Sequence, residues 1–345
     1  MMRLGLLMLA ACATSPDTSV ESPGQYAVGT KATSLANGER TLGVQLFFPT
    51  ADATSDTPFA QLELPEHQAM YGSLLASAPS CPTRSLDVGV DATPLAGSFP
   101  VVLFSHCHSC TRLSNATTAT RLASHGFVVV SVDHTGDALW DDLAGHPADL
   151  TSAELQLRAS DVRTALDAVP TLIASADAGN VGVFGHSFGS VTAGEVAQDD
   201  DRIKAAAGLC APMDNPLTPG VSIAKLTLPL MFVLAVEDNS ITQFGNTLIE
   251  NNYRDAPDKV WKFEVPDAGH WSVSDINGLT DDFKPGCGDA TRMSDGSNFT
   301  YLDPSTGRQI AASYVTAYFK STLQGDAGAT AYLDDAHFGV DAMHE

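Results

Sequence analysis

A short apolar run that ends in a glycine-flanked serine constrains the fold of this chain more than any other stretch. Val181 to Phe184 are typical of a buried strand, and the next residues, 185–189, are Gly-His-Ser-Phe-Gly. The stretch that follows, 190–197, is rich in Ala and Val and is typical of a helix. A G-x-S-x-G motif between a strand and a helix predicts a sharp turn that lifts the serine above the strand end. The flanking glycines let strand and helix approach without Cβ clashes.

This turn predicts a nucleophile at Ser187. The helix behind the turn directs its N-terminus at the serine, so the Phe188 N–H can donate a hydrogen bond to a developing oxyanion. The alternative is a glycine-rich turn around a buried serine, and the strand and helix on either side argue against it. His186 lies inside the motif, and we expect it to be a packed structural histidine.

The acidic composition excludes several classes of partner. The chain has 41 Asp and Glu against 18 Lys and Arg, a net charge of −23. Nucleic acids and anionic membrane surfaces are bound by clustered Lys and Arg, which this chain lacks. With 345 residues, 44% of them hydrophobic, it can bury one large core. We therefore expect a single domain over residues 26–345.

The N-terminal residues are typical of an export signal. Residues 1–12 carry one positive charge, a short apolar run and small residues before Cys12. Residues 9–12, Leu-Ala-Ala-Cys, resemble the lipobox of bacterial lipoproteins, which implies lipidation of Cys12 and attachment to a membrane only through that lipid. An ordinary cleaved secretory signal is the alternative. Residues 13–25 are polar and are expected to form a tether. We therefore expect a periplasmic, cell-surface or secreted protein.

The remaining apolar runs predict an α/β fold. Residues 100–105 and 126–133 are apolar without alternation, as in strands buried on both faces, and residues 113–125 between them have the length of a helix. A capping box at Thr151 to Glu154 opens a further helix. Strands alternating with helices predict a doubly wound, mostly parallel sheet with helices on both faces. Further strands are expected at 203–210, 228–236 and 260–265, a last helix at 307–323, an edge hairpin within 26–48, and an insertion near the site mouth at 49–99.

Two residues at strand ends can complete a catalytic triad with the serine, which needs a general base and an acid that orients it. Asp238 follows the strand at 228–236, and His270 follows the strand at 260–265. Carboxyl ends of parallel strands are where open sheets place their sites, so we expect Asp238 and His270 to join Ser187. Glu237 and Asp214 are alternatives for the acid. His337 and His344 are expected at the surface.

Several segments together resemble a known family. They are Pro100–Asp133, the motif at 185–189 and Asp-Arg-Ile-Lys-Ala-Ala-Ala at 201–207. This set resembles plasma-type platelet-activating-factor acetylhydrolases and dienelactone-hydrolase-like bacterial esterases, and less closely cutinase-like polyester hydrolases. The resemblance covers residues 100–325 and implies an α/β-hydrolase fold, Ser187 as nucleophile and His270 as base. It also implies hydrolysis of carboxylic esters, often with short acyl groups, without a metal or other cofactor.

The chain departs from this family at two places. The position that matches the triad acid of the acetylhydrolases is Cys210, so the acid has moved to Asp238 or the triad is incomplete. The oxyanion loop of the family is His-Gly-x-Gly, whereas residues 106–110 are His-Cys-His-Ser-Cys. By position the His108 N–H becomes the second oxyanion donor beside that of Phe188. Losing both glycines restricts the backbone of this loop.

The loop at 106–110 also permits other interpretations. Its two His and two Cys could bind a metal, form a redox pair, form a structural disulfide or remain thiols. Structural zinc sites draw ligands from two separated pairs, and no second pair exists. Beyond Cys12 there are five cysteines, so at most two disulfides form and the pairing stays open: Cys81, Cys107, Cys110, Cys210 and Cys287.

The predicted function is hydrolysis of carboxylic esters, with short-acyl esters favoured and polyesters as the alternative. A non-enzymatic surface-binding lipoprotein on a hydrolase scaffold and a metal or redox protein are the other possibilities. We expect the substrate pocket to be built from residues 49–99, 135–150 and 272–305.

Overall fold

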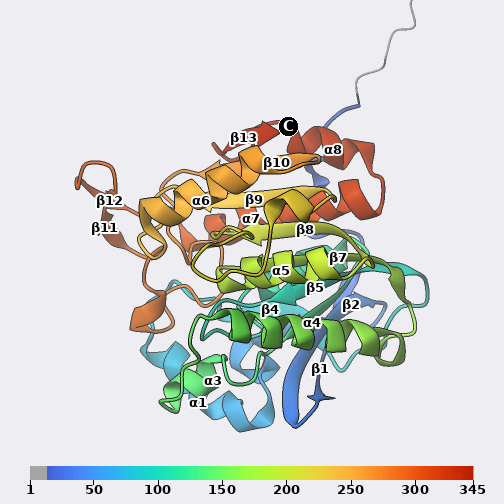
Figure 1. Ribbon diagram of the computed structural model, residues 1–345. Coiled ribbons are helices and arrows are strands. Elements are labelled where there is room, and N and C mark those ends of the chain that lie inside the picture. The colour runs from blue at the N-terminus through green and yellow to red at the C-terminus, as the bar shows by residue number, and fades with distance from the viewer. Residues whose placement is uncertain (1–13, 345) are drawn as a thin grey trace, which may run out of the picture.

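The computed structural model describes residues 14–344 of the chain (Figure 1). A mixed sheet of eleven strands forms the centre of the fold. The strand order is β13-β10-β9-β8-β7-β5-β6-β2-β1-β4-β3. The six strands from β10 to β6 in this order are parallel to one another, and the pairs at either end of this group, β13–β10 and β6–β2, are antiparallel. The bounds are Ala27–Asn37 (β1), Arg40–Thr50 (β2), Ser55–Pro58 (β3), Ser85–Val90 (β4), Phe99–Ser105 (β5), Val128–Val132 (β6), Ala176–His186 (β7), Ile203–Leu209 (β8), Leu230–Ala235 (β9), Val260–Val265 (β10) and Asp341–His344 (β13).

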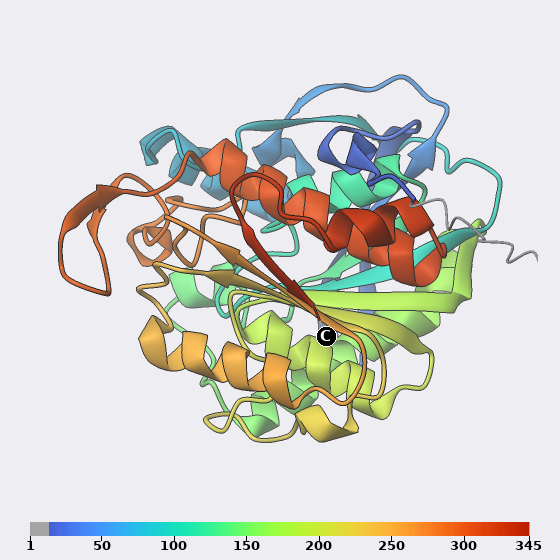
Figure 2. The ribbon, with the colours of Figure 1, turned by 90° about the horizontal axis from the view of Figure 1, so that it is seen from above.

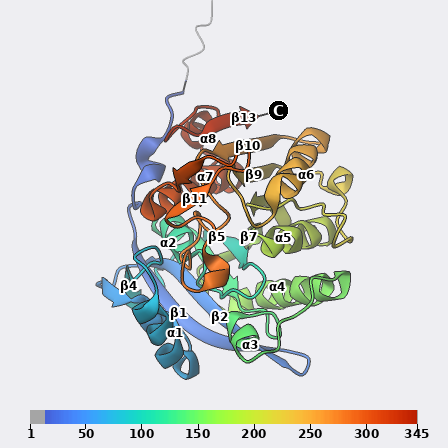
Figure 3. The same cartoon turned by 90° about the vertical axis from the view of Figure 1, so that its left-hand side faces the viewer.

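Helices cover both faces of this sheet, as predicted. Figure 3 shows α4, α5 and α6 on one side of the strands and α2 and α7 on the other. A separate buried apolar cluster lies under each layer, because the central strands present Val, Ala, Leu and Phe to both faces. The helices are Pro65–Ser77 (α1), Ala116–Ser124 (α2), Leu139–Leu143 (α3), Ser152–Leu172 (α4), Phe188–Asp199 (α5), Thr242–Asp255 (α6), Pro304–Leu323 (α7) and Ala327–Leu333 (α8). The predicted α/β-hydrolase architecture is confirmed.

Local sequence signals place two of these helices. The Thr151 side chain accepts a hydrogen bond from the Glu154 N–H at 3.2 Å and caps α4. The Asp303 side chain caps α7 by accepting from the N–H groups of Ser305 and Thr306. Short 3-10 helices occur at Thr18–Glu21 (η1), Phe59–Leu62 (η2), Ile223–Lys225 (η3) and Asp281–Phe283 (η4).

The segment at 49–99 extends the sheet, which differs from its interpretation as an insertion near the site mouth. The β1–β2 hairpin is antiparallel as predicted, but it does not lie at the sheet edge. β4 pairs with β1, and β3 pairs with β4, because the outer backbone groups of β1 need partners. A disulfide between Cys81 and Cys287 then joins this segment to the loop after β10.

The predicted tether at 13–25 is wrong for residues 17–25, which pack onto the domain. Val20 is fully buried, Asp17 pairs with Lys320 of α7, and Glu21 accepts a hydrogen bond from the Tyr332 hydroxyl at 3.1 Å. These contacts outweigh the polar composition that suggested a free segment. Residues 1–12, with Cys12, lie outside the described residues. Within the described part of the chain, every helix is too short or too polar to cross a membrane.

A small hairpin projects from the domain after β10. It consists of Asp289–Thr291 (β11) and Asn298–Thr300 (β12), and Figures 1 and 2 show it standing away from the sheet. The sequence analysis did not predict it, since each strand has only three residues.

Candidate active site

Ser187 occupies the tight turn predicted from the sequence, between β7 and α5. Its backbone has φ 55° and ψ −123°, a conformation that few non-glycine residues adopt. Its N–H donates to the Leu209 carbonyl at 2.9 Å. A Cβ added at Gly185 would lie 1.9 Å from the Gly189 carbonyl oxygen, and one at Gly189 would lie 2.0 Å from the Ser105 carbonyl oxygen. Only glycine fits at both flanks, so the motif is required by close packing.

The structure brings Asp238 and His270 together at the carboxyl ends of β9 and β10. Both side chains are buried, and Asp238 Oδ2 lies 2.7 Å from His270 Nδ1. The other carboxylate oxygen accepts from the N–H groups of Ser240 and Ile241 at 3.0 and 3.1 Å. Because the carboxylate accepts from Nδ1–H, His270 Nε2 is left free to take up a proton.

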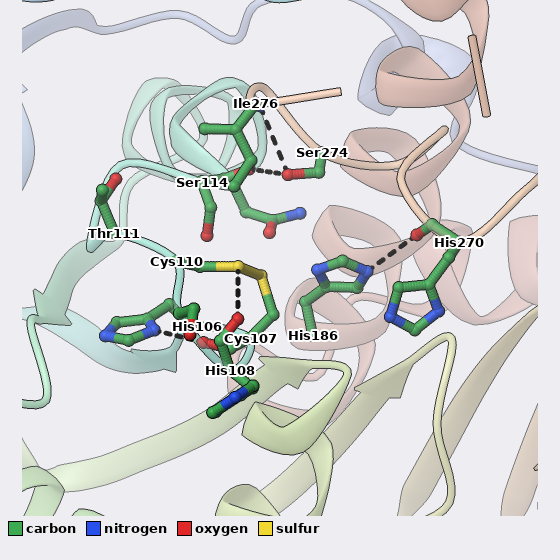
Figure 4. Close-up of a disulfide and its surroundings, with 12 residues drawn as sticks. His106, Cys107, His108, Cys110, Thr111, Ser114, His186, His270, Ser274 and Ile276 are labelled. Atoms are coloured by element: carbon green, nitrogen blue, oxygen red, sulfur yellow. Dashed lines mark hydrogen bonds between the residues drawn. A yellow bond between two sulfur atoms is a disulfide. The ribbon is translucent and has the colours of Figure 1, made fainter. Parts of the chain in front are cut away.

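His186 joins this pair to the serine turn. Its Nε2 donates to the His270 carbonyl at 2.9 Å, and the two rings lie 5.0 Å apart (Figure 4). Burial, and then the neighbouring His270, lower the pKa of His186 well below its usual value. The ring is therefore neutral and carries its proton on Nε2. This geometry agrees with the structural role expected for His186.

The alternative acids face other partners. Glu237 pairs with Arg292 at 3.0 Å and accepts from the Met293 N–H at 2.8 Å, both beside the projecting hairpin. Asp214 accepts from the Ile223 N–H at 2.9 Å. Neither carboxylate is paired with a histidine.

Among the described residues, no hydrogen bond or ion pair joins His337, His344 or the free cysteine to His270. His337 stacks on Tyr332 with ring centres 3.7 Å apart, and His344 lies on the edge strand β13. Cys210 follows β8, is fully buried and is a free thiol. Burial, followed by the Asp238 carboxylate, raises the pKa of Cys210 well above its usual value, so the thiol stays neutral.

The loop at 106–110 contains a disulfide between Cys107 and Cys110 (Figure 4). Of the possibilities left open for these cysteines, the structure therefore has the disulfide. Ser109 adopts φ 54°, the left-handed conformation that glycine takes most readily, at the second glycine position of the related loops. Its N–H donates to Asp137 Oδ1 at 3.2 Å. The described residues contain no group of three or more His, Cys, Asp or Glu side chains placed to hold a metal ion.

A cavity of about 380 Å³ opens beside the serine. His108, Ser187 and Phe188 lie in its wall together, and most of the other lining side chains are apolar. Three of these are unusually exposed: Leu150 at 51%, Leu217 at 69% and Phe244 at 54%. The others are Val191, Ala211, Pro212, Asn215, Thr218, Ser240, Ile241, Gly245 and Leu248.

The prediction of which segments form the substrate pocket is largely wrong. Only Leu150 comes from residues 135–150, and the segments 49–99 and 272–305 contribute nothing to this cavity. Residues 211–218 and 240–248, which follow β8 and β9, form most of the wall instead. The sequence carried a signal for them, because loops at the carboxyl ends of parallel strands surround the site in such folds.

Two family descriptions match this chain. Platelet-activating factor acetylhydrolase, isoform II, matches residues 13–140. The PET hydrolase-like family matches residues 92–274, more than half of the chain and including the serine turn and both members of the Asp238–His270 pair. The chain belongs to the PET hydrolase-like family. The expected resemblance to α/β-hydrolase esterases is confirmed, with matches to the acetylhydrolases and to the polyester hydrolases.

The fold of this PET hydrolase-like protein also occurs in a solved esterase. A ferulic acid esterase from Streptomyces cinnamoneus superposes with a TM-score of 0.70 at 24% identity, over 96% of this chain and 98% of that one. At this identity the likeness establishes the shared fold. No curated protein sequence matches the PET hydrolase-like chain.

Proposed function

We propose that this protein is a serine hydrolase that cleaves carboxylic esters through an acyl-enzyme on Ser187. One observation carries the proposal. A serine on a strained turn lies in the wall of an apolar cavity, and its neighbour in the turn, His186, is hydrogen-bonded to the histidine of a buried carboxylate–imidazole pair. This arrangement supports nucleophilic catalysis with a general base that needs no metal.

The first half-reaction forms the acyl-enzyme. The Ser187 hydroxyl attacks the ester carbonyl, and His270 Nε2 takes the hydroxyl proton. Asp238 stabilises the imidazolium that forms, since its carboxylate lies 2.7 Å from the other ring nitrogen. His270 then gives its proton to the departing alcohol. In the second half-reaction, water repeats the attack on the acyl-enzyme and releases the acid.

Two backbone N–H groups are proposed to hold the oxyanion. Phe188 is the first residue of α5, and the first N–H groups of a helix have no partner within the helix. The helix dipole adds positive potential at the same place. The His108 N–H is the second donor, and His108 lines the same cavity as Ser187. Loss of one such donor typically slows an enzyme by about 10²- to 10³-fold.

The substrate is proposed to be an ester with a short or medium apolar acyl group. A cavity of about 380 Å³ with mostly apolar walls fits such a group. A polyester is the second candidate, and one observation favours it. Leu150, Leu217 and Phe244 expose apolar surface around the cavity mouth, as contact with an apolar polymer requires.

The proposal is tested by hydrolysis of p-nitrophenyl acetate, butyrate and octanoate, with release of soluble acids from a polyester film measured alongside. We expect turnover of the short esters in the presence of a chelator and none with Ser187→Ala. Equal activity of wild type and Ser187→Ala would contradict the proposal. If both are inactive towards every ester, the protein is better explained as a binding protein on a hydrolase scaffold.

We also propose export, with lipidation of Cys12. The motif at residues 9–12 supports it. Labelling of cells with a radioactive fatty acid tests it, since wild type should incorporate label and Cys12→Ala should not. A label-free wild type recovered from the medium would instead support an ordinary secretory signal.

A further inference from the structure

A fully buried arginine contacts the helix that carries one proposed oxyanion donor. Arg158 belongs to α4, and none of its surface is exposed. Its guanidinium carbon lies 4.8 Å from the centre of the Phe188 ring. Its Nε donates to the Thr192 hydroxyl at 3.1 Å, one turn further along α5. Arg158 therefore fixes where α5 begins relative to α4.

The same guanidinium holds the loop that carries the other proposed donor. One of its terminal nitrogens donates to the His106 carbonyl, and the other donates to Asp137. The second oxygen of Asp137 lies 2.5 Å from His108 Nδ1 and accepts from the Ser109 N–H. Arg158 thus contacts the loop directly at residue 106 and through Asp137 at residues 108 and 109.

The charge of Arg158 matters for this arrangement. Burial opposes ionisation of Asp137, but Arg158 and His108 outweigh it and hold the pKa of that carboxyl well below its usual range. Asp137 is therefore an anion, and it accepts a hydrogen bond from the Ser109 N–H of the loop. Without Arg158 the carboxylate would be buried with no full counter-charge, which is strongly unfavourable.

A second Ser-His-Asp chain supports Arg158 from behind. Ser105 Oγ lies 3.3 Å from an Arg158 terminal nitrogen and 2.9 Å from His134 Nε2, and His134 Nδ1 lies 3.1 Å from Asp161. Arginine can only donate, so the Ser105 hydroxyl donates to His134, which donates to Asp161. All three side chains are buried, so no substrate reaches this serine. We call these three residues the enclosed chain, and its geometry suits orientation of Arg158.

We infer that Arg158 is a positioning residue of the oxyanion hole: it sets the Phe188 and His108 N–H groups relative to each other, with the enclosed chain holding it in place. The inference rests on the proposed function of Ser187. Arg158 is a single side chain that links both donor segments, which come from distant parts of the sequence. Preorganised donors act only when their spacing matches the oxyanion, so a residue that sets the spacing affects the transition state more than substrate binding.

The chain offers a matched control. Arg112 is also fully buried and pairs with two carboxylates, Glu63 and Asp133, at 2.7 Å each. Its guanidinium contacts neither α5 nor residues 106–109 through any of these bonds. Loss of either arginine leaves buried charge uncompensated, so both replacements should lower the melting temperature. Only one should change the oxyanion hole.

The experiment compares Arg158→Met, Arg158→Lys and Asp137→Asn with Arg112→Met. We expect kcat for p-nitrophenyl butyrate to fall about 10²-fold in Arg158→Met and Asp137→Asn, with KM close to wild type. The inhibition constant of a boronic acid that forms a tetrahedral adduct on Ser187 should rise by the same factor. Arg158→Lys should recover only part of the loss, because an ammonium cannot reproduce the planar fork.

The control should keep the wild-type kcat per folded molecule. A folded Arg158→Met enzyme with wild-type kcat overturns the inference, and so does an equal loss of kcat in Arg112→Met. If Arg158→Met does not fold, Asp137→Asn and Thr192→Val, which each weaken one of the contacts that Arg158 makes, provide the same comparison. An inactive wild type, or an active Ser187→Ala, instead overturns the proposed function. Both are assayed before the Arg158 variants, so a failure of the proposed function is distinguished from a failure of this inference.

Discussion

Asp238 and Cys210 lie at the carboxyl ends of two neighbouring parallel strands, β9 and β8, and the Asp238 carboxylate contributes to the raised pKa of the Cys210 thiol. The acetylhydrolase resemblance places the triad acid at the position of Cys210. The structure instead pairs His270 with the carboxylate one strand further along the sheet. Moving the carboxylate from residue 238 to residue 210 tests whether the position expected from the resemblance can also serve His270.

Asp238→Asn should lower kcat for short p-nitrophenyl esters by about 10⁴-fold, because an amide no longer fixes the proton on His270 Nδ1. The fold should survive, since the side chain keeps its shape and can still accept from the N–H groups of Ser240 and Ile241. Steady-state kinetics together with a thermal melt check this. Glu237→Gln is the control and should keep most of the activity. The reverse ranking would give the role of the acid to Glu237.

Adding Cys210→Asp to the Asp238→Asn variant should raise kcat about 10- to 10²-fold above that of the Asp238→Asn single variant. The backbone at Cys210 has φ 53°, a region in which Asp is tolerated better than most residues. Replacing Asp238 by Asn also removes the charge that would repel a second buried carboxylate. Cys210→Ser in the same background lacks the carboxylate and should restore nothing. Equal recovery in both double variants would show that a carboxylate at residue 210 does not reach His270.

The two disulfides should affect different properties. Cys81–Cys287 closes a loop of 206 residues, whereas Cys107–Cys110 spans three. The chain-entropy model gives about 5 kcal/mol of stability for the first and about 2 kcal/mol for the second. Replacing Cys81 and Cys287 with serines should therefore lower the free energy of unfolding more than replacing Cys107 and Cys110. Replacing Cys107 and Cys110, which flank the His108 donor, should lower kcat more.

Urea unfolding and ester kinetics on the two double-serine variants check this ranking. A protein without Cys107 and Cys110 that keeps full kcat would show that the loop holds its shape through Arg158 and Asp137 alone. Cys210→Ser should leave the number of disulfides unchanged, because Cys210 is the free cysteine among the described residues.

Stability should fall as the pH drops below 6.5. Burial lowers the pKa of His106 to about 3 and those of His134 and His186 well below 6.5. Below pH 6.5 these three histidines therefore bind protons in the unfolded chain and stay neutral in the folded protein. Stability present above pH 6.5 is therefore lost as the pH falls, by up to about 1.4 kcal/mol per pH unit for each histidine. Glu63, whose pKa burial raises to about 6, opposes this with one proton between pH 4.5 and 6.

Urea midpoints between pH 8 and 5 measure this dependence. His134→Asn should flatten it by one proton, since Asn does not titrate. Midpoints that stay constant down to pH 5 would contradict neutral burial of these histidines.

Local sequence signals predicted the central fold. Unbroken apolar runs indicated the parallel strands, and the glycines at 185 and 189 indicated the turn, because packing there leaves no room for a Cβ. The end-of-strand rule also predicted that Asp238 and His270 would meet. These signals depend on residues close in sequence or on the shared direction of parallel strands.

The features that the sequence did not predict depend on contacts between distant segments. In the sequence, Arg158 is one more charged residue on an amphipathic helix. Its role beside the oxyanion donors becomes visible only from its contacts with Phe188 and His106. The docking of residues 17–25 depends on Lys320 and Tyr332, about 300 positions away. The pairing of β4 with β1 likewise has no local pattern, since only two residues of each strand are in register.

The cavity wall has a consequence for how such a protein can change its preference among esters. Leu150 and Leu217 come from two separate loops and Phe244 from the first turn of α6, and all three are more than half exposed, so the folded core gains little from them. Substitutions at such positions usually change stability by less than about 0.5 kcal/mol. The residues that do the chemistry and those that hold the chain together therefore lie elsewhere. Selection, natural or in the laboratory, can vary the rim of the cavity freely and keep the catalytic apparatus fixed.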